Sequence, residues 1–257
     1  MTEELAFETD GPIARITLRR PAKLNALTPA MLSALVAACD AIDTDPAIRC
    51  ALLLAEGKAF CAGADINAWS GLSPVEMWQR WIVPGHSAFG RLAALRVPSI
   101  AVVEGPCFGG GLELALCCDM RFASQAANFS MPEVSIGTLP GWGGTGRLPR
   151  AVGLPRARQM IFSGERVEAT RAEQWGLVNG VFDGDGARAE AERLAALIAS
   201  RAPVAVAAAK LALAAQENDA PMRALEALGG AIASASADAR EGLASFREKR
   251  PPVWQGR

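Results

Sequence analysis

The sequence predicts an α/β core followed by a helical C-terminal region. Two short apolar runs, residues 50–55 (CALLLA) and 99–104 (SIAVVE), are bounded by turn residues and therefore favour buried strands over helices. Helical stretches alternate with the expected strands, which is typical of an α/β domain. After about Gly186 the chain is dominated by Ala, Leu, Glu, Arg and Lys, which indicates helices without intervening strands. We therefore expect a core over residues 1–186 and a helical region over residues 187–257.

The elements of the core follow from local patterns. Residues 13–18 (IARITL) alternate apolar and polar side chains, as a half-buried strand does. A helix is expected to begin at Thr28, with Pro29 as its first residue, and to run to about Ile42. The remaining expected elements are a long helix and two short strands, at residues 74–95, 119–123 and 177–182.

The C-terminal region is expected to hold three or four helices. Its pattern is interrupted at Pro203, at Pro221 and at Ala237-Asp238. Such helices must bury their apolar faces against the core, against another subunit, or against both. The alanine bias of this region is explained most simply by genomic composition.

The composition narrows the class of partner. Lys and Arg together number 26 against 27 Asp and Glu, which gives no reason to expect nucleic acid or an anionic membrane as a partner. The N-terminal residues lack the charged start and apolar run of a signal peptide, and no apolar run reaches the ~18–20 residues that cross a bilayer. We expect a soluble, cytoplasmic protein.

Cysteine and histidine usage argues against a metal site. The six cysteines form no CxxC pair, and the chain has a single histidine, His86, so ligands at zinc spacing are missing. Most of the cysteines lie in apolar segments, where a thiol behaves as a small hydrophobic group. A His-dependent catalytic triad is also difficult to build when His86 is the sole candidate. We predict no metal and no redox cofactor.

Two glycine-rich segments each follow an expected strand. Residues 57–66 (GKAFCAGADI) hold small side chains that let a ligand approach the backbone, although a tight turn is the better explanation of this segment taken alone. Residues 105–118 (GPCFGGGLELALCC) lead three glycines into an apolar helix, whose first turn presents free N–H groups suited to an anion or an oxyanion. The spacing fits neither a dinucleotide fingerprint nor a Walker loop.

Two glutamates are candidates for acid–base chemistry. Glu113 lies in the first turn of the apolar helix, where a buried carboxylate is costly unless it is paired or used. The alternative is that Glu113 only complements the helix dipole, worth roughly 0.3–1 kcal/mol. Glu133 lies in a Pro-punctuated stretch before a glycine-rich loop, and by itself it is an ordinary surface carboxylate. Two carboxylates that meet in space can divide the acid and base roles.

Six stretches, in order and spacing, resemble the enoyl-CoA hydratase/isomerase (crotonase) superfamily. They are Arg20-Pro21 through Leu27, GKAFCAGADI, GPCFGGGLELALCCD, MPEVSIGTLPGWGGTGRLPRAVG (131–153), the helix-turn around Ala172 to Leu177, and EGLASFREKRPP (241–252). The resemblance implies a spiral of ββα units with a helical C-terminal region used in trimerisation, and commonly a hexamer made of two trimers.

The resemblance also assigns site residues. It implies an oxyanion hole on the backbone N–H groups of Ala64 and Gly110, with Glu113 and Glu133 as the catalytic glutamates. Gly141 matches a glycine that opens a helix pointing at the same site. The residues implied in binding the CoA part of the substrate are Lys23, Ala62, Asp65, Ile66, Phe246 and Lys249, of which Phe246 and Lys249 act from a neighbouring subunit.

The implied activity is reversible addition of water across the double bond of a 2-enoyl-CoA thioester, a lyase reaction of fatty-acid β-oxidation. CoA enters as part of an acyl-CoA substrate. The retention of both glutamates favours a hydratase, but an isomerase, a thioester hydrolase, a specialised hydroxyacyl-CoA dehydratase and a non-catalytic acyl-CoA-binding member stay open. Residues 67–90 are expected to shape the acyl pocket, with Trp69, Trp78, Trp81 and Phe89 either lining it or packing in the core. Trp142, beside the catalytic loop, is the better candidate for the lining.

Overall fold

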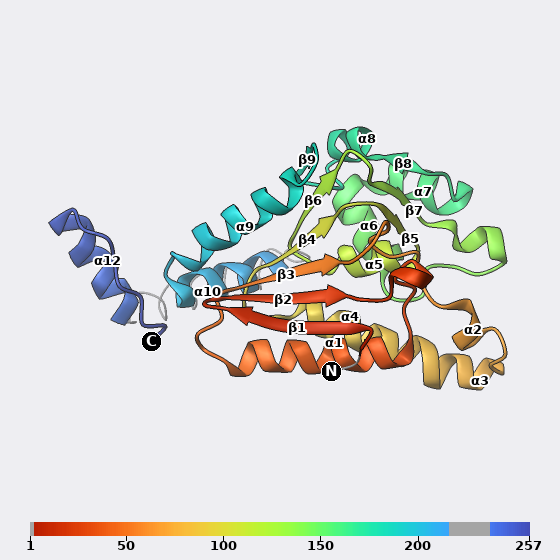
Figure 1. Cartoon of the computed structure of the whole chain (residues 1–257), viewed down its shortest axis with the longest axis horizontal. Helices are drawn as coiled ribbons and strands as arrows, with labels where there is room; N and C mark the ends of the chain where they lie inside the picture. The colour runs from red at the N-terminus through yellow and green to blue at the C-terminus, as the bar shows by residue number, and fades with distance from the viewer. Residues whose placement is uncertain (1–2, 216–236) are drawn as a thin grey trace.

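The computed structural model describes residues 3–215 and 237–257, and it has a mostly parallel sheet with helices on both faces (Figure 1). The larger sheet runs in the order β1-β2-β3-β4-β6-β9, and only β1 is antiparallel to its neighbour. Its strands are β1 (Leu5–Asp10), β2 (Ile13–Leu18), β3 (Cys50–Ala55), β4 (Ser99–Val103), β6 (Met120–Ser124) and β9 (Gly180–Phe182). The predicted α/β class is confirmed.

A second, smaller sheet lies at the end of the first. It consists of β5 (Pro106–Phe108), β7 (Asn128–Ser130) and β8 (Val167–Glu168) in the order β5-β7-β8. The chain passes from β4 to β5 and from β6 to β7 within a few residues, so successive turns of the backbone contribute a strand to each sheet. This repetition builds the spiral.

The larger sheet separates two apolar cores. On β3, Ala51 and Leu53 face the main core, whereas Cys50, Leu52 and Leu54 face a smaller core on the other side. Successive side chains of a strand point to opposite faces, which explains why an apolar run without alternation forms a strand buried on both sides. Helices α1 (Pro29–Thr44) and α4 (Val83–Ala93) cover one face, and α9 (Gly186–Ala199) covers the other (Figure 1).

The start of α1 is as predicted. Thr28 is the N-cap, and its hydroxyl accepts a hydrogen bond of 3.2 Å from the backbone N–H of Met31. Pro29 follows as the first helical residue, where the missing N–H of proline costs no helical hydrogen bond. The helix extends two residues beyond the expected Ile42.

The stretch expected to be helical over residues 74–95 is helical over residues 74–93, in three consecutive segments of different helix type. It starts at a capping box formed by Ser73 and Glu76 and continues through α3 (Pro74–Glu76), the π-helix η2 (Met77–Ile82) and α4. The backbone N–H of Val83 reaches back to the carbonyl of Trp78, a five-residue step. Pro84 has no N–H with which to continue a regular α-helical ladder at this junction.

The remaining elements are helices, found between the strands and in the C-terminal region. They are η1 (Pro21–Lys23), α2 (Ile66–Trp69), α5 (Gly110–Ala115), η3 (Pro132–Ile136), α6 (Gly144–Val152), α7 (Leu154–Ser163), α8 (Ala169–Gln174), α10 (Pro203–Ala214) and α12 (Ala237–Glu248). Helices α10 and α12 begin at two of the predicted breaks, while the break predicted at Pro221 lies outside the described residues. Helix α12 stands apart from the sheet, at the end of the molecule opposite α2 and α3 (Figure 1).

Within the described ranges, no single helix has the length and apolar character needed to cross a membrane. Helices α9 and α10 reach that length and composition only when they are counted as one segment, and the chain bends by 113° between them.

Candidate active site

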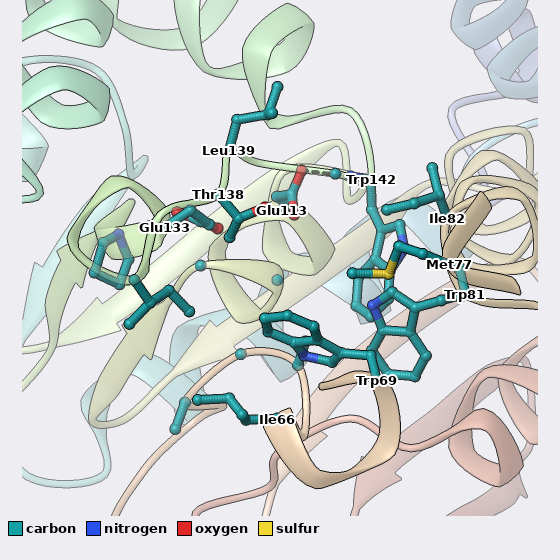
Figure 2. Close-up of a pocket in the computed structure, with 18 of the residues that line it drawn as sticks. Ile66, Trp69, Met77, Trp81, Ile82, Glu113, Glu133, Thr138, Leu139 and Trp142 are labelled. Atoms are coloured by element: carbon teal, nitrogen blue, oxygen red, sulfur yellow. Dashed lines mark hydrogen bonds between the residues drawn. The ribbon is translucent and has the colours of Figure 1, made fainter. Parts of the chain in front are cut away.

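A cavity of about 250 Å³ opens where the carboxyl ends of β3 and β4 lead into glycine-rich loops (Figure 2). Seven of the eleven residues predicted for the site line it: Ala62, Ala64, Ile66, Gly110, Glu113, Glu133 and Gly141. The first three come from the loop and helix after β3, and the others from the loops and helices that follow β4 and β7. Segments far apart in the sequence therefore meet at this cavity.

Backbone pairing brings the two predicted oxyanion donors together. The loop after β3 is fixed by a bridge between Leu27 and Ala64 and by a second bridge between Cys61 and Cys107. The backbone nitrogen of Ala64 lies 3.4 Å from the place a Cβ on Gly110 would occupy. No hydrogen bond between described residues uses the N–H of Ala64 or of Gly110. Both N–H groups therefore lack a hydrogen-bond acceptor among the described residues.

Glycine is required at two positions of the segment that carries Gly110. Gly109 has φ +51°, a conformation that L side chains rarely adopt, and a Cβ there would also lie 2.9 Å from Glu133 Oε1. A Cβ on Gly111 would lie 2.3 Å from the carbonyl oxygen of Cys61. The glycine run thus lets the two loops approach closely enough to place their N–H groups side by side.

Glu113 is held by the loop before α6. Its side chain is buried, and Oε1 accepts hydrogen bonds from the backbone N–H groups of Trp142 (2.8 Å) and Gly144 (2.7 Å). Burial raises the pKa of the Glu113 carboxyl, while the N–H groups of Gly144, Trp142 and Gly141 counteract part of that rise. These donors orient the carboxylate at the wall of the cavity.

Glu133 reaches the same cavity from η3. Its Oε2 atom is buried and has no hydrogen-bond partner among the described residues. Burial raises the pKa of Glu133 to about 7, and the negative charge of Glu113 adds to that rise. Glu133 is therefore not the ordinary surface carboxylate that its local sequence alone suggested. Figure 2 shows both glutamates projecting into one cavity.

Three tryptophans line the other side of the cavity. Trp69, Trp81 and Trp142 face it (Figure 2), whereas Trp78 is not part of the lining and is 61% exposed. Phe89 is fully buried against Trp142, with ring centroids 5.1 Å apart, and does not belong to the lining. The expectation is thus fulfilled by Trp69, Trp81 and Trp142 but not by Trp78 or Phe89.

Other lining residues were not singled out from the sequence. They are Met77, Ile82, Pro132, Ser135, Ile136, Thr138 and Leu139, together with the glycines at 63 and 109. Thr138 and Leu139 lie in the sequence between two predicted site residues, Glu133 and Gly141, and this position could have indicated that they line the cavity. Met77 and Ile82 lie within residues 67–90, the stretch expected to shape the acyl pocket, but the sequence did not single them out there.

The residues predicted to bind CoA are not all at the cavity. Asp65 caps α2 through the N–H of Asn67 and pairs with Arg20 at 2.7 Å. Burial alone would raise the pKa of Asp65, but Arg20, the Asn67 N–H and the charge of Lys23 together lower it. Lys23 is exposed. It lies beside this loop, because the N–H of Ala62 donates a hydrogen bond to the carbonyl of Leu24, the next residue after Lys23.

The two C-terminal candidates are distant from the cavity within one chain. Lys249 is exposed at the end of α12, at the opposite end of the molecule (Figure 1). Phe246 belongs to α12, but its side chain lies outside the described residues. Within one chain, no described residue of α12 lines the cavity.

Among the described residues, neither a cysteine nor a histidine lines the cavity. Burial raises the pKa of the Cys61 thiol to about 12, so this cysteine is protonated and unreactive near neutral pH. His86 is exposed on α4 and does not line the cavity. In residues 3–215 and 237–257, no group of three or more His, Cys, Asp or Glu side chains is arranged to hold a metal ion.

The geometry suits chemistry at a polarised carbonyl. Two free N–H groups can donate to one oxygen on which negative charge develops, which is the arrangement of an oxyanion hole. Two carboxyl groups at the same cavity can supply and accept protons at neighbouring atoms. Tryptophan and aliphatic side chains make up most of the remaining lining.

Comparison with known proteins points to one family. The sequence model of the family described as Enoyl-CoA hydratase/isomerase matches residues 8–257. The chain is 37% identical to the 2,3-dehydroadipyl-CoA hydratase of Escherichia coli K12, over 99% of both chains. It is 36% identical to the crotonyl-CoA hydratase of Syntrophomonas wolfei, over 96% of both. The crystal structure of an enoyl-CoA hydratase from Bacillus anthracis superimposes with a TM-score of 0.94 at 32% identity, covering 99% of this chain and 100% of that one.

Proposed function

Since the chain belongs to the enoyl-CoA hydratase/isomerase family, we propose that it adds water reversibly across the C2=C3 double bond of a 2-enoyl-CoA thioester. The resemblance and the crotonase-type fold predicted from the sequence are confirmed by the family match and by the structural similarity. The observation that carries the proposal is the meeting of two carboxyl groups, Glu113 and Glu133, with two free backbone N–H groups at one apolar cavity.

The N–H groups of Ala64 and Gly110 stabilise the thioester oxygen. Conjugate addition of water places negative charge on this oxygen as the enolate forms. Donors fixed by the backbone need no reorganisation at the moment of reaction, and the loss of one such donor typically costs about 3–4 kcal/mol. The two bridges that hold the loops together are what keep this pair in place.

The two glutamates divide the proton transfers. Glu113 is the base, because the N–H groups of Trp142 and Gly144 favour its ionised form and orient it toward the attacking water. Glu133 is the acid that delivers a proton to the α-carbon, because its raised pKa of about 7 keeps a proton available near neutral pH. Gly141 contributes by shaping the start of the loop that holds Glu113. In the reverse direction the same two groups exchange roles.

The presence of two carboxyl groups at the cavity, Glu113 and Glu133, supports hydration over the other reactions of the family. Adding water needs a base at the β-carbon and an acid at the α-carbon, whereas moving a double bond along the chain can be done by one carboxyl that shuttles a proton. Both Glu113 and Glu133 face the cavity here. A member without catalytic activity would have no reason to keep a buried, unpartnered carboxyl oxygen at Glu133.

CoA is part of the substrate and is bound at the rim. Ala62 and Ile66 line the cavity next to Ala64, and Lys23 lies beside this loop as a cation for the CoA phosphates. Asp65 acts indirectly, since its pair with Arg20 fixes the loop. Lys249 and Phe246 complete the nucleotide site from a neighbouring subunit, which requires a homotrimer or a dimer of trimers.

A panel of acyl-CoA substrates tests this function. The purified protein should show its highest kcat/KM on a trans-2-enoyl-CoA, with the 3-hydroxyacyl-CoA as product. A higher kcat/KM for a 3-enoyl-CoA would identify an isomerase instead. Release of free CoA from a saturated acyl-CoA would identify a thioester hydrolase, and a lack of turnover throughout the panel would contradict an enzymatic role.

A further inference from the structure

The end of the cavity away from Glu133 is built mainly from aromatic side chains. Trp69, Trp81 and Trp142 gather there with Met77 and Ile82, and Glu113 lies between this group and Glu133 (Figure 2). A 2-enoyl group whose thioester oxygen is held at Ala64 and Gly110 and whose double bond lies between the glutamates must direct its remaining carbons toward this aromatic end. The side chains there therefore determine which acyl groups enter.

The π-helix directs three of these side chains into the cavity. Its hydrogen bonds span five residues, as the bond from the N–H of Val83 to the carbonyl of Trp78 shows. In a helix of this wider turn, residues four and five positions apart lie on one face, which places Trp81 and Ile82 above Met77. Trp78 is turned outward and is exposed.

The indole of Trp142 packs directly against Gly85, in space that a larger residue at position 85 would fill. A Cβ on Gly85 of α4 would lie 2.0 Å from Trp142 Nε1, and a Cβ on Gly110 would lie 3.0 Å from Trp142 Cζ3. The indole therefore spans from α4 to the oxyanion donor Gly110. It is fixed by a hydrogen bond of 3.3 Å from Nε1 to the carbonyl of Trp81 and by packing against Trp81 and Phe89, with ring centroids 5.0 and 5.1 Å away. Trp142 is 2% exposed.

The space that remains is small. A dry apolar cavity of about 150 Å³ holds one benzene ring, a six-carbon group. The cavity here measures about 250 Å³. After a six-carbon acyl group has entered, the remainder is needed for the thioester carbonyl and the attacking water. Longer acyl chains would have to displace Trp142.

The cavity also lacks a partner for a charged acyl group. Among the described residues that line it, none is Lys, Arg or His, and the ionisable ones are Glu113 and Glu133. A carboxylate at the far end of the acyl chain would be buried among indole rings without a counter-ion and near two acidic groups, which is strongly unfavourable.

We propose that Trp142, seated against Gly85, closes the acyl pocket and restricts this enzyme to uncharged acyl groups of about four to six carbons. The proposal deepens the hydratase function and rests on it. Trp142 then has two roles. Its backbone N–H holds Glu113, and its ring limits which acyl groups can bind. The proposal also separates two classes of substrate, the neutral enoyl-CoAs and those that end in a carboxylate.

The wild-type protein tests the charge and length limits. Crotonyl-CoA, trans-hex-2-enoyl-CoA, trans-dec-2-enoyl-CoA and 2,3-dehydroadipyl-CoA are compared by kcat/KM. Hexenoyl-CoA and dehydroadipyl-CoA have six-carbon acyl groups that differ at the terminal carboxylate, and we expect the charged one to be poorer by about 10²-fold or more. Decenoyl-CoA should be poorer than hexenoyl-CoA by about tenfold or more. Equal kcat/KM within either pair overturns the proposal. A failure of the proposed function differs from this, because then no 2-enoyl-CoA is hydrated.

Variants test the role of Trp142 itself. In Trp142→Ala the ratio of kcat/KM for decenoyl-CoA to that for hexenoyl-CoA should rise by about tenfold or more, since the pocket then extends to Gly85. Trp142→Phe, which keeps an aromatic ring, should raise the ratio less and guards against misfolding of the alanine variant. Trp78→Ala, the exposed tryptophan of the same region, is the matched control and should leave the ratio unchanged. An unchanged ratio in both Trp142 variants refutes the assignment.

The contact between Gly85 and the Trp142 ring is tested by combining two substitutions. Gly85→Ala places a methyl group where the indole nitrogen lies, so it should lower kcat/KM on hexenoyl-CoA in the wild type. In the Trp142→Ala background the same methyl group meets no indole and should have little further effect. Equal effects of Gly85→Ala in the two backgrounds would show that Gly85 does not hold Trp142, and the proposal would fail.

Discussion

Glu133 should make the stability of the protein depend on pH near neutrality. The carboxyl has a pKa of about 7 in the folded protein against the ordinary value of 4.5. The folded state therefore holds a proton that the unfolded state releases between about pH 4.5 and 7. Because the folded state binds more protons in this window, the free energy of unfolding falls as pH rises through it.

Glu133→Gln removes this dependence while keeping the shape of the side chain. The shift of about 2.5 pKa units corresponds to at most about 3 kcal/mol, since each unit is worth about 1.36 kcal/mol and the side chain is only partly shielded from solvent. The variant should match the wild type at pH 4 and become more stable above pH 7 by up to that amount.

Thermal unfolding at fixed protein concentration, from pH 4 to 8.5, measures the effect as the difference in midpoint between variant and wild type. Glu168→Gln changes an exposed glutamate and serves as the matched control. A difference for Glu133→Gln that stays flat across this pH range would refute the burial of an unpartnered carboxyl at this position.

Four further outcomes are expected. Glu113→Gln and Glu133→Gln should each lower kcat on crotonyl-CoA by about 10²–10⁴-fold, and the double variant should be little worse than the poorer single one, as a kinetic comparison will show. Activity needs one proton on the glutamate pair, so wild-type kcat/KM should decline as pH rises through about 7, and a pH profile that is flat from 6 to 8.5 would contradict this. Lys23→Ala combined with Lys249→Ala should raise KM more than it lowers kcat, whereas an unchanged KM would show that both lysines are only solvated. Light scattering at micromolar concentration should give the mass of a trimer or hexamer, and a monomeric mass would exclude a site shared between subunits.

Local patterns predicted those elements of the fold whose residues are determined by their own neighbours. The alternation over residues 13–18 and the apolar run at 50–55 match β2 and β3 in full, and Thr28 caps α1 as expected. In these segments propensity, burial and capping act together within a few residues.

Elements that depend on distant partners were not predicted. Strand β1 (Leu5–Asp10) has one buried side chain and exists because it pairs with β2 at the sheet edge. The strands of the smaller sheet are two or three residues long and were missed for the same reason. The π-helix interrupts a stretch whose spacing predicted one continuous helix, and only the completed structure separates Trp81, in the cavity, from the exposed Trp78.

The candidate site shows the same division. Glu113 stood out from the sequence as a carboxylate in an apolar helix, but its partners Trp142 and Gly144 lie 29 and 31 residues away. Glu133 gained its role only through the resemblance, since its burial is created by folding. Periodicity cannot reveal an interaction between two loops, which depends on backbone approach at residues such as Gly111.

The most direct test of the central claim uses crotonyl-CoA in water enriched in oxygen-18. Mass spectrometry of the products locates the incorporated oxygen atom. The account predicts intact 3-hydroxybutyryl-CoA with one oxygen-18 on its C3 hydroxyl, formed by the wild type and at least about a hundredfold more slowly by Glu113→Gln. Label found in a free carboxylate together with released CoA, or equal rates in wild type and variant, would contradict it.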